Sequence, residues 1–215
     1  MTSNKDLANI RREYGQRPLT RVSLQTDPLD QLKIWLEEAI MAEVNEPTAM
    51  SVASVDAQGC PDLRVVLLKD IVAEQLIFYT NYQSCKAQQF AVNPNVALAF
   101  YWPELSRQIR IRGKIDKAST KISNQYFTSR PRGSQLSALA SPQSQVIGTR
   151  QWLEQRYQEV EQQWNDQSIP RPSEWGGYQI KPSEYEFWQG RDSRLHDRFR
   201  YRFVESYWQI DRLAP

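Results

Sequence analysis

From Ala49 to Asn81 the chain consists of short runs of β-prone residues with no helical segment between them. Three strands are expected here, at 49–55, 63–69 and 75–81, and an Asp-Ala-Gln-Gly turn separates the first two. Two more strands are expected at 96–102 and 107–115, and strand character returns from Trp175 onward. Because strands and helices do not alternate regularly, as they would in a βαβ protein, the pattern indicates an α+β fold. We expect it to be mainly antiparallel β and to form a barrel.

The sequence also predicts helices. Asp27 and Pro28 are residue types typical of an N-cap and a first helical position, and Leu29, Leu32 and Trp35 begin an apolar stripe. This helix is expected at roughly 28–44. Further helices are expected at 84–92, at 119–130, where Pro131 stops the helix, and at 151–164.

Composition and charge exclude several classes of protein. The 215 residues suit one domain, or a dimer of one-domain subunits, and 27 Lys and Arg against 25 Asp and Glu leave a formal charge of +2. This balance gives no general attraction to nucleic acid. The longest apolar run, 96–102, is far shorter than the ~20 residues that span a bilayer, and residues 1–20 carry no secretory signal. We expect a cytoplasmic protein with no nucleic-acid or membrane partner.

Common metal and nucleotide motifs do not occur. Cys60 and Cys85 lack CxxC spacing and are too few for a disulfide framework, and a single histidine, His196, excludes the usual zinc ligand sets. No GxGxxG, P-loop, GxSxG or HExxH sequence is present. We expect no metal site, and the candidate chemistry rests on basic residues within apolar or aromatic strands.

Arg64 and Lys69 flank the apolar run Val-Val-Leu-Leu. An unbroken strand would point two residues five apart to opposite faces. They are either strand-end charges that reach water, or ligands for two anionic groups on two sides of the strand, or ligands for one group bound across a bulge.

Tyr126 and Arg130 are four residues apart on one expected helix face, and Ser134 follows the break at Pro131. A phenol, a guanidinium and a hydroxyl that converge at a helix end suit a phosphate monoester. The alternative is that all three are ordinary surface residues.

Arg194, His196 and Arg198 alternate, so in a strand they share one face. A lone histidine is commonly structural, but three cationic or titratable groups near Trp188 favour an anionic ligand, because unpaired buried charge is costly. Trp188, Tyr79 and Tyr185 are candidate walls for a flat aromatic ligand, and core packing is the alternative for each.

Five groups of residues match one known family. They are RVVLLK at 64–69, FYTN at 78–81, YFTSRPR at 126–132, EFWQG at 186–190 with RLHDR at 194–198, and IDRLAP at 210–215. They closely resemble the pyridoxine/pyridoxamine 5′-phosphate oxidase family of FMN-binding split-barrel proteins. The likeness extends from about Arg11 to Pro215, and 170–198 is its most specific part.

The resemblance implies a split β-barrel with flanking helices, and a homodimer that holds FMN at the subunit interface. It implies oxidation of pyridoxine 5′-phosphate or pyridoxamine 5′-phosphate to pyridoxal 5′-phosphate, with O2 reduced to H2O2. It also implies an N-terminal arm or lid at 1–20. A single FMN-binding domain at 21–215 would then include the C-terminal region for dimerisation and substrate binding.

The resemblance assigns site residues as well. The residues implied to bind FMN are Arg64, Lys69, Tyr79, Thr80, Lys86, Gln108, Gln143, Ser144, Trp188 and Arg198. Those implied to bind the substrate are Arg11, Tyr14, Lys69, Tyr126, Arg130, Ser134, Arg194 and His196. Arg194 and His196 would lie over the substrate ring as the catalytic pair, and Arg11 and Tyr14 would belong to the covering arm.

The sequence departs from the family pattern at two positions. Cys85 stands next to Lys86 where members carry an arginine, and Glu46 stands where an aspartate is often found. The alternative function is a non-catalytic split-barrel protein that carries flavin or pyridoxal phosphate. Binding of single-stranded nucleic acid is disfavoured by the small net charge.

Overall fold

The structure is a computed structural model that describes residues 18–215. Backbone contacts divide these residues into two compact units. Unit 1 comprises the described part of Met1–Pro47 together with Ala99–Arg110 and Glu184–Pro215, and unit 2 comprises Thr48–Leu98 and Ile111–Ser183. Most of the arm predicted at 1–20, with Arg11 and Tyr14, lies outside the described residues. The arm and the single domain at 21–215 therefore stay predictions.

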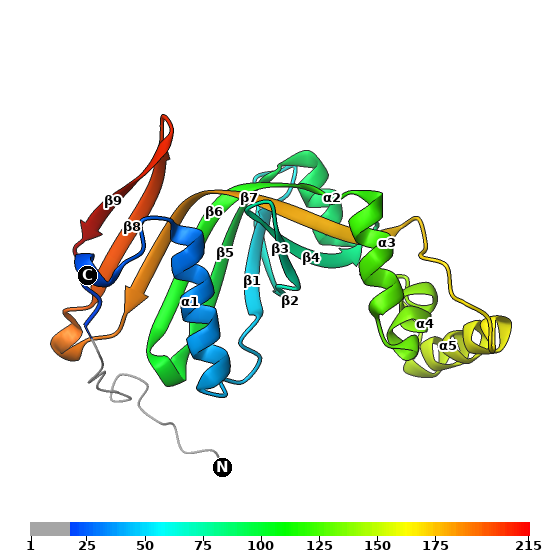
Figure 1. The fold of residues 1–215 in the computed structure, drawn as a ribbon. Coiled ribbons are helices and arrows are strands. Elements are labelled where there is room, and N and C mark those ends of the chain that lie inside the picture. The colour runs from blue at the N-terminus through cyan, green and yellow to red at the C-terminus, as the bar shows by residue number, and fades with distance from the viewer. Residues whose placement is uncertain (1–17) are drawn as a thin grey trace, which may run out of the picture. The chain divides into compact units, whose positions relative to one another are not determined.

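The strands of the described residues belong to one sheet (Figure 1). Their order is β2 (Pro61–Leu67), β1 (Ala49–Val55), β5 (Asn95–Trp102), β6 (Arg107–Lys117), β7 (Trp175–Gln189), β4 (Gln75–Asn81) and β3 (Asp70–Val72). Strand β8 (Asp197–Val204) pairs with β7 and with β9 (Tyr207–Leu213). The pairs β1–β2, β3–β4, β4–β7, β7–β8 and β8–β9 are all antiparallel. The predicted α+β fold with a mainly antiparallel sheet is confirmed.

Helix α1 (Pro28–Met41) covers the apolar core of unit 1. Trp35 on its inner face makes an edge-on ring contact with Phe187 of β7, at 5.2 Å between centroids. The predicted N-cap is present, because the Asp27 carboxylate accepts a hydrogen bond from Leu29 N at 2.7 Å and Pro28 begins the helix. Side-chain chemistry at the first turn thus fixes the start of α1.

Asp27→Ala is expected to lower the free energy of unfolding by about 1 kcal/mol, because the first turn of α1 loses its side-chain acceptor. Asp27→Asn retains an acceptor oxygen and is expected to unfold nearly as wild type. Urea unfolding of the three proteins measures both effects. An equal loss in the two variants would show that the carboxylate charge, and not the cap hydrogen bond, is what matters.

Unit 2 contains four helices among its described residues, namely α2 (Cys85–Val92), α3 (Thr120–Ser129), α4 (Arg132–Ala140) and α5 (Arg150–Trp164). α4 and α5 lie side by side (Figure 1). They enclose a small core with α3 and the start of β7, made of Phe127, Leu136, Ala140, Val160, Ile169 and Trp175. No helix of residues 18–215 is both long enough and apolar enough to cross a membrane.

Most predicted elements lie within three residues of their observed bounds, but two elements were not predicted. β3 has three residues, too few for an alternating pattern to be visible. α4 follows Pro131 directly, and it buries only Leu136 and Ala140, so its apolar stripe is weak. α1 ends three residues earlier than expected, and Ile40 in its last turn is 53% exposed.

Candidate functional site

A pocket in unit 2 gathers most of the predicted ligands for phosphate. Its volume is about 430 Å³, which is within the usual range for small-molecule sites. Four of its lining side chains are cationic, and none of the described lining residues is acidic. The lining residues are Arg64, Val65, Val66, Leu67, Lys69, Tyr79, Thr80, Lys86, Tyr126, Arg130, Gln143 and Trp175. Such a wall attracts an anionic ligand.

Arg64 and Lys69 line this pocket together, although an unbroken strand would have separated them. β2 ends at Leu67, and Lys69 lies in the connection to β3, where its backbone N donates to Ile77 O at 2.8 Å. The opposite facing that an unbroken strand would impose on the two cations does not apply, because the strand ends before Lys69.

Lys86 lies in the first turn of α2 and is half-buried. Its Nζ donates to Thr80 Oγ1 at 3.4 Å, and the Thr80 hydroxyl in turn donates to Gln143 Oε1 at 2.8 Å. Burial lowers the pKa of Lys86, and the nearby charge of Arg64 lowers it further. An anion bound here would relieve both effects, since it stabilises the protonated amine.

Three aromatic rings form a stack beside these cations. Tyr79 of β4 lies parallel to Tyr126 of α3 at 3.8 Å between centroids, and parallel to Trp175 of β7 at 5.5 Å. Burial is the main cause that raises the pKa of Tyr79 to about 12, so its phenol stays neutral at physiological pH. The stack gives the pocket a rigid aromatic wall.

Arg130 lies at the C-cap of α3, and its guanidinium carbon is 4.5 Å from the centroid of the Trp175 ring. Its Nη1 is buried and has no hydrogen-bond partner among the described residues. Burial lowers the pKa of Arg130, whereas Tyr126 opposes that shift. A buried donor without an acceptor is costly, so this side chain suits a ligand that brings an acceptor oxygen.

Ser134 and Ser144 are not among the lining residues of the pocket. Ser134 lies in the first turn of α4, where its backbone N donates to Pro131 O at 2.8 Å. Ser144 is exposed in the segment between α4 and α5 and has a φ of 70°. Its neighbour Gln143 does line the pocket, held by the contact with Thr80.

The remaining predicted residues, Gln108, Trp188, Arg194, His196 and Arg198, belong to unit 1. Arg198 donates through Nε and Nη2 to Glu186 Oε1 at 2.9 and 2.7 Å. The Glu186 side chain is 8% exposed and also pairs with Arg110 at 3.0 Å. Glu186 is therefore the buried counter-ion of two arginines.

His196 packs against Trp188, with 4.6 Å between the ring centroids. Its Nδ1 accepts a hydrogen bond from Arg191 N at 3.1 Å, which leaves the proton of the neutral ring on Nε2. Burial lowers the pKa of His196, and the charge of Arg194 adds to this effect. The ring is therefore a neutral Nε2–H donor near pH 7.

The expectation that Arg194, His196 and Arg198 share a strand face is wrong. Arg194 ends the 3-10 turn η4 (Asp192–Arg194) with a φ of 62°, and β8 begins only at Asp197. Only Arg198 of the three lies in a strand, because the left-handed residues Ser193 and Arg194 break the extended backbone before it.

Sequence reasoning missed three site residues, namely Asp62, Gln89 and Trp175. Asp62 and Gln89 contact Arg64 from β2 and α2. Asp62 is two residues before Arg64 in the same strand, so strand alternation was a usable indication of its contact, whereas Gln89 is 25 residues away and the sequence gave none. Trp175 completes the aromatic wall. Its neighbouring glycines, Gly176 and Gly177, were a usable indication that this segment packs closely against aromatic residues. A Cβ at either position would collide with tyrosine side chains at 2.1 to 3.0 Å.

The fold and the site together define the class of protein. PhzG of Burkholderia lata, solved with tetrahydrophenazine-1-carboxylic acid, is similar with a TM-score of 0.87 and 28% identity, over 94% of this chain and 100% of that one. A pyridoxamine 5′-phosphate oxidase-related, FMN-binding protein of Nostoc punctiforme shares the fold, with a TM-score of 0.73, 15% identity, and coverage of 89% and 100%. The chain has the split-barrel fold with flanking helices that the sequence predicted.

Sequence comparisons then give the family. Residues 36–164 match the family model described as pyridoxamine 5′-phosphate oxidase, and residues 175–215 match the pyridoxine 5′-phosphate oxidase C-terminal dimerisation region. A pyridoxine/pyridoxamine 5′-phosphate oxidase of Legionella pneumophila (strain Paris) is 48% identical over 215 residues, which cover 100% of both chains. The chain belongs to the pyridoxamine 5′-phosphate oxidase family, as its motifs indicated.

Proposed function

We propose that this protein is an FMN-dependent oxidase that converts pyridoxine 5′-phosphate or pyridoxamine 5′-phosphate into pyridoxal 5′-phosphate. O2 is the proposed electron acceptor and H2O2 the second product. The observation that carries the proposal is the pocket of unit 2, where four cations and an aromatic stack line a wall without acidic residues among those described. In a member of this family two phosphates, one on the cofactor and one on the substrate, would account for the four cations of the pocket.

The residues of the pocket fit FMN. Lys86 and Arg64 offer charged donors to its phosphate, and Thr80 and Gln143, which are hydrogen-bonded to each other, lie beside Lys86. The proposed FMN ligands also include Lys69, Tyr79, Gln108, Ser144, Trp188 and Arg198. The chemistry that FMN supplies when bound is two-electron oxidation, with O2 as the final acceptor.

Arg130 is the proposed anchor of the substrate phosphate. Its buried Nη1 has no acceptor among the described residues, and the Trp175 ring holds the plane of the guanidinium. Tyr126 is four residues earlier on α3 and lines the same pocket, so its hydroxyl is available to the same phosphate. Lys69 and Ser134 complete the proposed phosphate ligands. Two charge-assisted hydrogen bonds from one arginine would fix the distance of the phosphate from the reacting carbon.

Arg194 and His196 are the proposed catalytic pair. Arg194 would orient the substrate ring and stabilise negative charge that develops on it. His196, a neutral Nε2–H donor, would hydrogen-bond an oxygen of the substrate without adding a full charge. Arg11 and Tyr14 are proposed to belong to an arm that covers the site and excludes water.

The proposed assembly is a homodimer with FMN at the subunit interface. It is supported by the match of residues 175–215 to a family region that is named for dimerisation. The proposed location is the cytoplasm, where the two exposed free cysteines, Cys60 and Cys85, would stay reduced.

The purified protein is expected to be yellow and to release FMN on denaturation. Under anaerobic conditions pyridoxine 5′-phosphate is expected to bleach the flavin absorbance, and admission of O2 is expected to restore it. A flavin spectrum that neither phosphorylated substrate bleaches would favour the non-catalytic carrier. A colourless protein that takes up no added FMN would contradict both functions.

A further inference from the structure

The guanidinium of Arg64 is already engaged by the protein. Its Nη1 donates to Val52 O at 3.1 Å and to Ser54 Oγ at 2.6 Å. Its Nη2 donates to Asp62 Oδ2 at 2.6 Å and to Gln89 Oε1 at 2.9 Å. An arginine has five N–H donors, so these contacts with described residues use all but Nε–H.

Asp62 is the carboxylate in this set. Its Oδ2 also accepts from Gln89 Nε2 at 3.1 Å. The Asp62 side chain is 45% exposed, whereas that of Arg64 is 17% exposed, so the pair lies at the edge of the pocket and not in the core. The hydrogen bond from Gln89 and the charge of Arg64 hold the pKa of Asp62 below its usual value, so the carboxylate is ionised at neutral pH.

The charge of Asp62 is not needed to hold Arg64 in its orientation. Three of the four contacts, those with Val52, Ser54 and Gln89, do not involve the carboxylate and come from neutral groups. They would hold the guanidinium in place without Asp62. What Asp62 alone contributes is a negative charge beside a cation that lines an anion-binding pocket.

We propose that Asp62 is an internal counter-ion of Arg64, and that it weakens the binding of phosphate in this pocket and so sets the affinity for FMN. The role rests on the proposed function, because it takes the FMN phosphate as the ligand of Arg64. Asp62 acts through Arg64, with which it forms a salt bridge at 2.6 Å. A phosphate that approaches must share the arginine with a carboxylate already in contact with it.

Cys85 lies on the same side of Arg64 as Asp62. Its Sγ is 4.0 Å from Asp62 Oδ2 and 3.5 Å from Gln89 Nε2, and it is not a lining residue of the pocket. An arginine at position 85, the residue type that the family pattern carries, would therefore meet Asp62 before it met a phosphate. By pairing with the carboxylate it would reduce the negative charge beside Arg64, while the contacts of Arg64 with Val52, Ser54 and Gln89 would remain.

The test is the dissociation constant of FMN, measured by quenching of flavin fluorescence with the full chain freed of flavin. Asp62→Asn removes the charge but keeps a similar shape and an acceptor oxygen. It is expected to tighten FMN binding roughly 3- to 10-fold at low ionic strength, and the gain is expected to shrink as salt is added. Riboflavin, which has no phosphate, is expected to bind wild type and variant equally.

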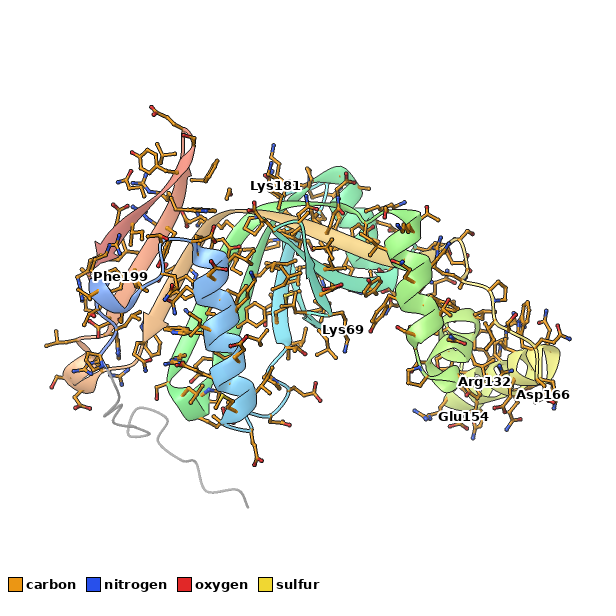
Figure 2. All side chains as sticks on the ribbon, in the orientation of Figure 1. Lys69, Arg132, Glu154, Asp166, Lys181 and Phe199 are labelled. Atoms are coloured by element: carbon orange, nitrogen blue, oxygen red, sulfur yellow. The ribbon has the colours of Figure 1, made fainter. Side chains whose placement is uncertain are left out.

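The matched control is Asp166→Asn, which makes the same change in net charge at an exposed position. Asp166 lies far from Lys69 within unit 2, beyond α5 (Figure 2). It is expected to leave the FMN dissociation constant unchanged. A similar gain in this variant would mean that net charge alone tightens binding, and it would overturn the role of Asp62.

A double-mutant cycle tests the same role through a second residue. Cys85→Arg is expected to tighten FMN binding in the wild-type background and to have little effect in the Asp62→Asn background. Equal gains in both backgrounds would show that the new arginine binds the phosphate directly. Weaker or unchanged FMN binding in Asp62→Asn would also overturn the proposal. A wild-type chain that binds neither flavin would overturn the proposed function itself, and the role of Asp62 with it.

Discussion

Arg130→Ala is expected to raise KM for pyridoxine 5′-phosphate by about 10- to 150-fold, because a hydrogen bond to a charged group contributes on the order of 1.5–3 kcal/mol. In the structure Arg130 is held over the Trp175 ring at 4.5 Å, with a buried Nη1 that has no acceptor among the described residues. Its alanine variant loses that donor without disturbing a hydrogen bond that Nη1 makes to the protein. Steady-state kinetics with air-saturated buffer measures the effect.

Arg132→Ala is the matched control for this prediction. Arg132 is two residues further along, is exposed, and donates to Gln167 O at 3.0 Å, so its removal makes the same change in charge outside the pocket. It is expected to leave KM unchanged. Arg130→Lys is expected to recover only part of the affinity, because an ammonium lacks the planar pair of donors. Unchanged KM and kcat in Arg130→Ala would remove Arg130 from the phosphate site.

The sequence predicted those parts of the fold that local patterns determine. β1 and β4 have the predicted bounds, and α1 begins where Asp27 and Pro28 place it. In these segments side-chain alternation or cap chemistry acts within a few residues. β3 and α4 were missed because one is too short for any periodicity and the other buries only two side chains.

In the candidate site, too, the sequence predicted what local spacing determines and missed what depends on the folded chain. Tyr126 and Arg130 line one pocket, as their spacing of four residues on a helix predicted. Spacing failed for Arg64 with Lys69, and for Arg194 with Arg198, because in each pair the strand is interrupted between the two residues. Strand ends depend on pairing partners and on left-handed residues, which an alternation pattern does not reveal.

Long-range partners of the arginines, unlike the neighbouring Asp62 of Arg64, are the part of the site that sequence spacing cannot supply. Arg64 meets Gln89 across 25 residues and Ser54 across 10, and Arg110 meets Glu186 across 76. These contacts depend on which strands and helices become neighbours in the folded chain. These hydrogen bonds and salt bridges decide which arginines already have partners within the protein, and therefore which cations of the site are available to a phosphate. Lys86 and Arg130, unlike Arg64, form no salt bridge with an acidic residue among residues 18–215, so they are the strongest candidates to bind a phosphate.

Loss of the Lys86 charge is expected to weaken FMN binding by about 10- to 150-fold, since its amine would make a charge-assisted contact with the phosphate worth on the order of 1.5–3 kcal/mol. Lys86→Gln keeps a polar side chain of similar length and removes the charge. Its FMN dissociation constant is expected to rise by this factor near pH 7, with riboflavin binding unchanged. FMN and riboflavin share the flavin ring and differ in the phosphate. The ratio of their affinities therefore separates the effect on the phosphate contact from any effect on binding of the flavin ring.

The lowered pKa of Lys86 gives the same prediction a pH dependence with a definite sign. Burial, and then the charge of Arg64, disfavour the protonated amine in the free protein, whereas a bound phosphate favours it. The contribution of Lys86 is therefore complete below the lowered pKa of the free protein and is lost as the pH rises from there through the higher pKa of the complex, and this loss begins at a lower pH than for an exposed lysine. Lys86→Arg stays charged and is expected to keep its FMN-to-riboflavin affinity ratio as the pH is raised from neutral into the alkaline range, whereas the ratio of the wild type falls. If the ratio falls equally in wild type and in Lys86→Arg, the titrating group is not Lys86, and the loss must come from another residue of the pocket.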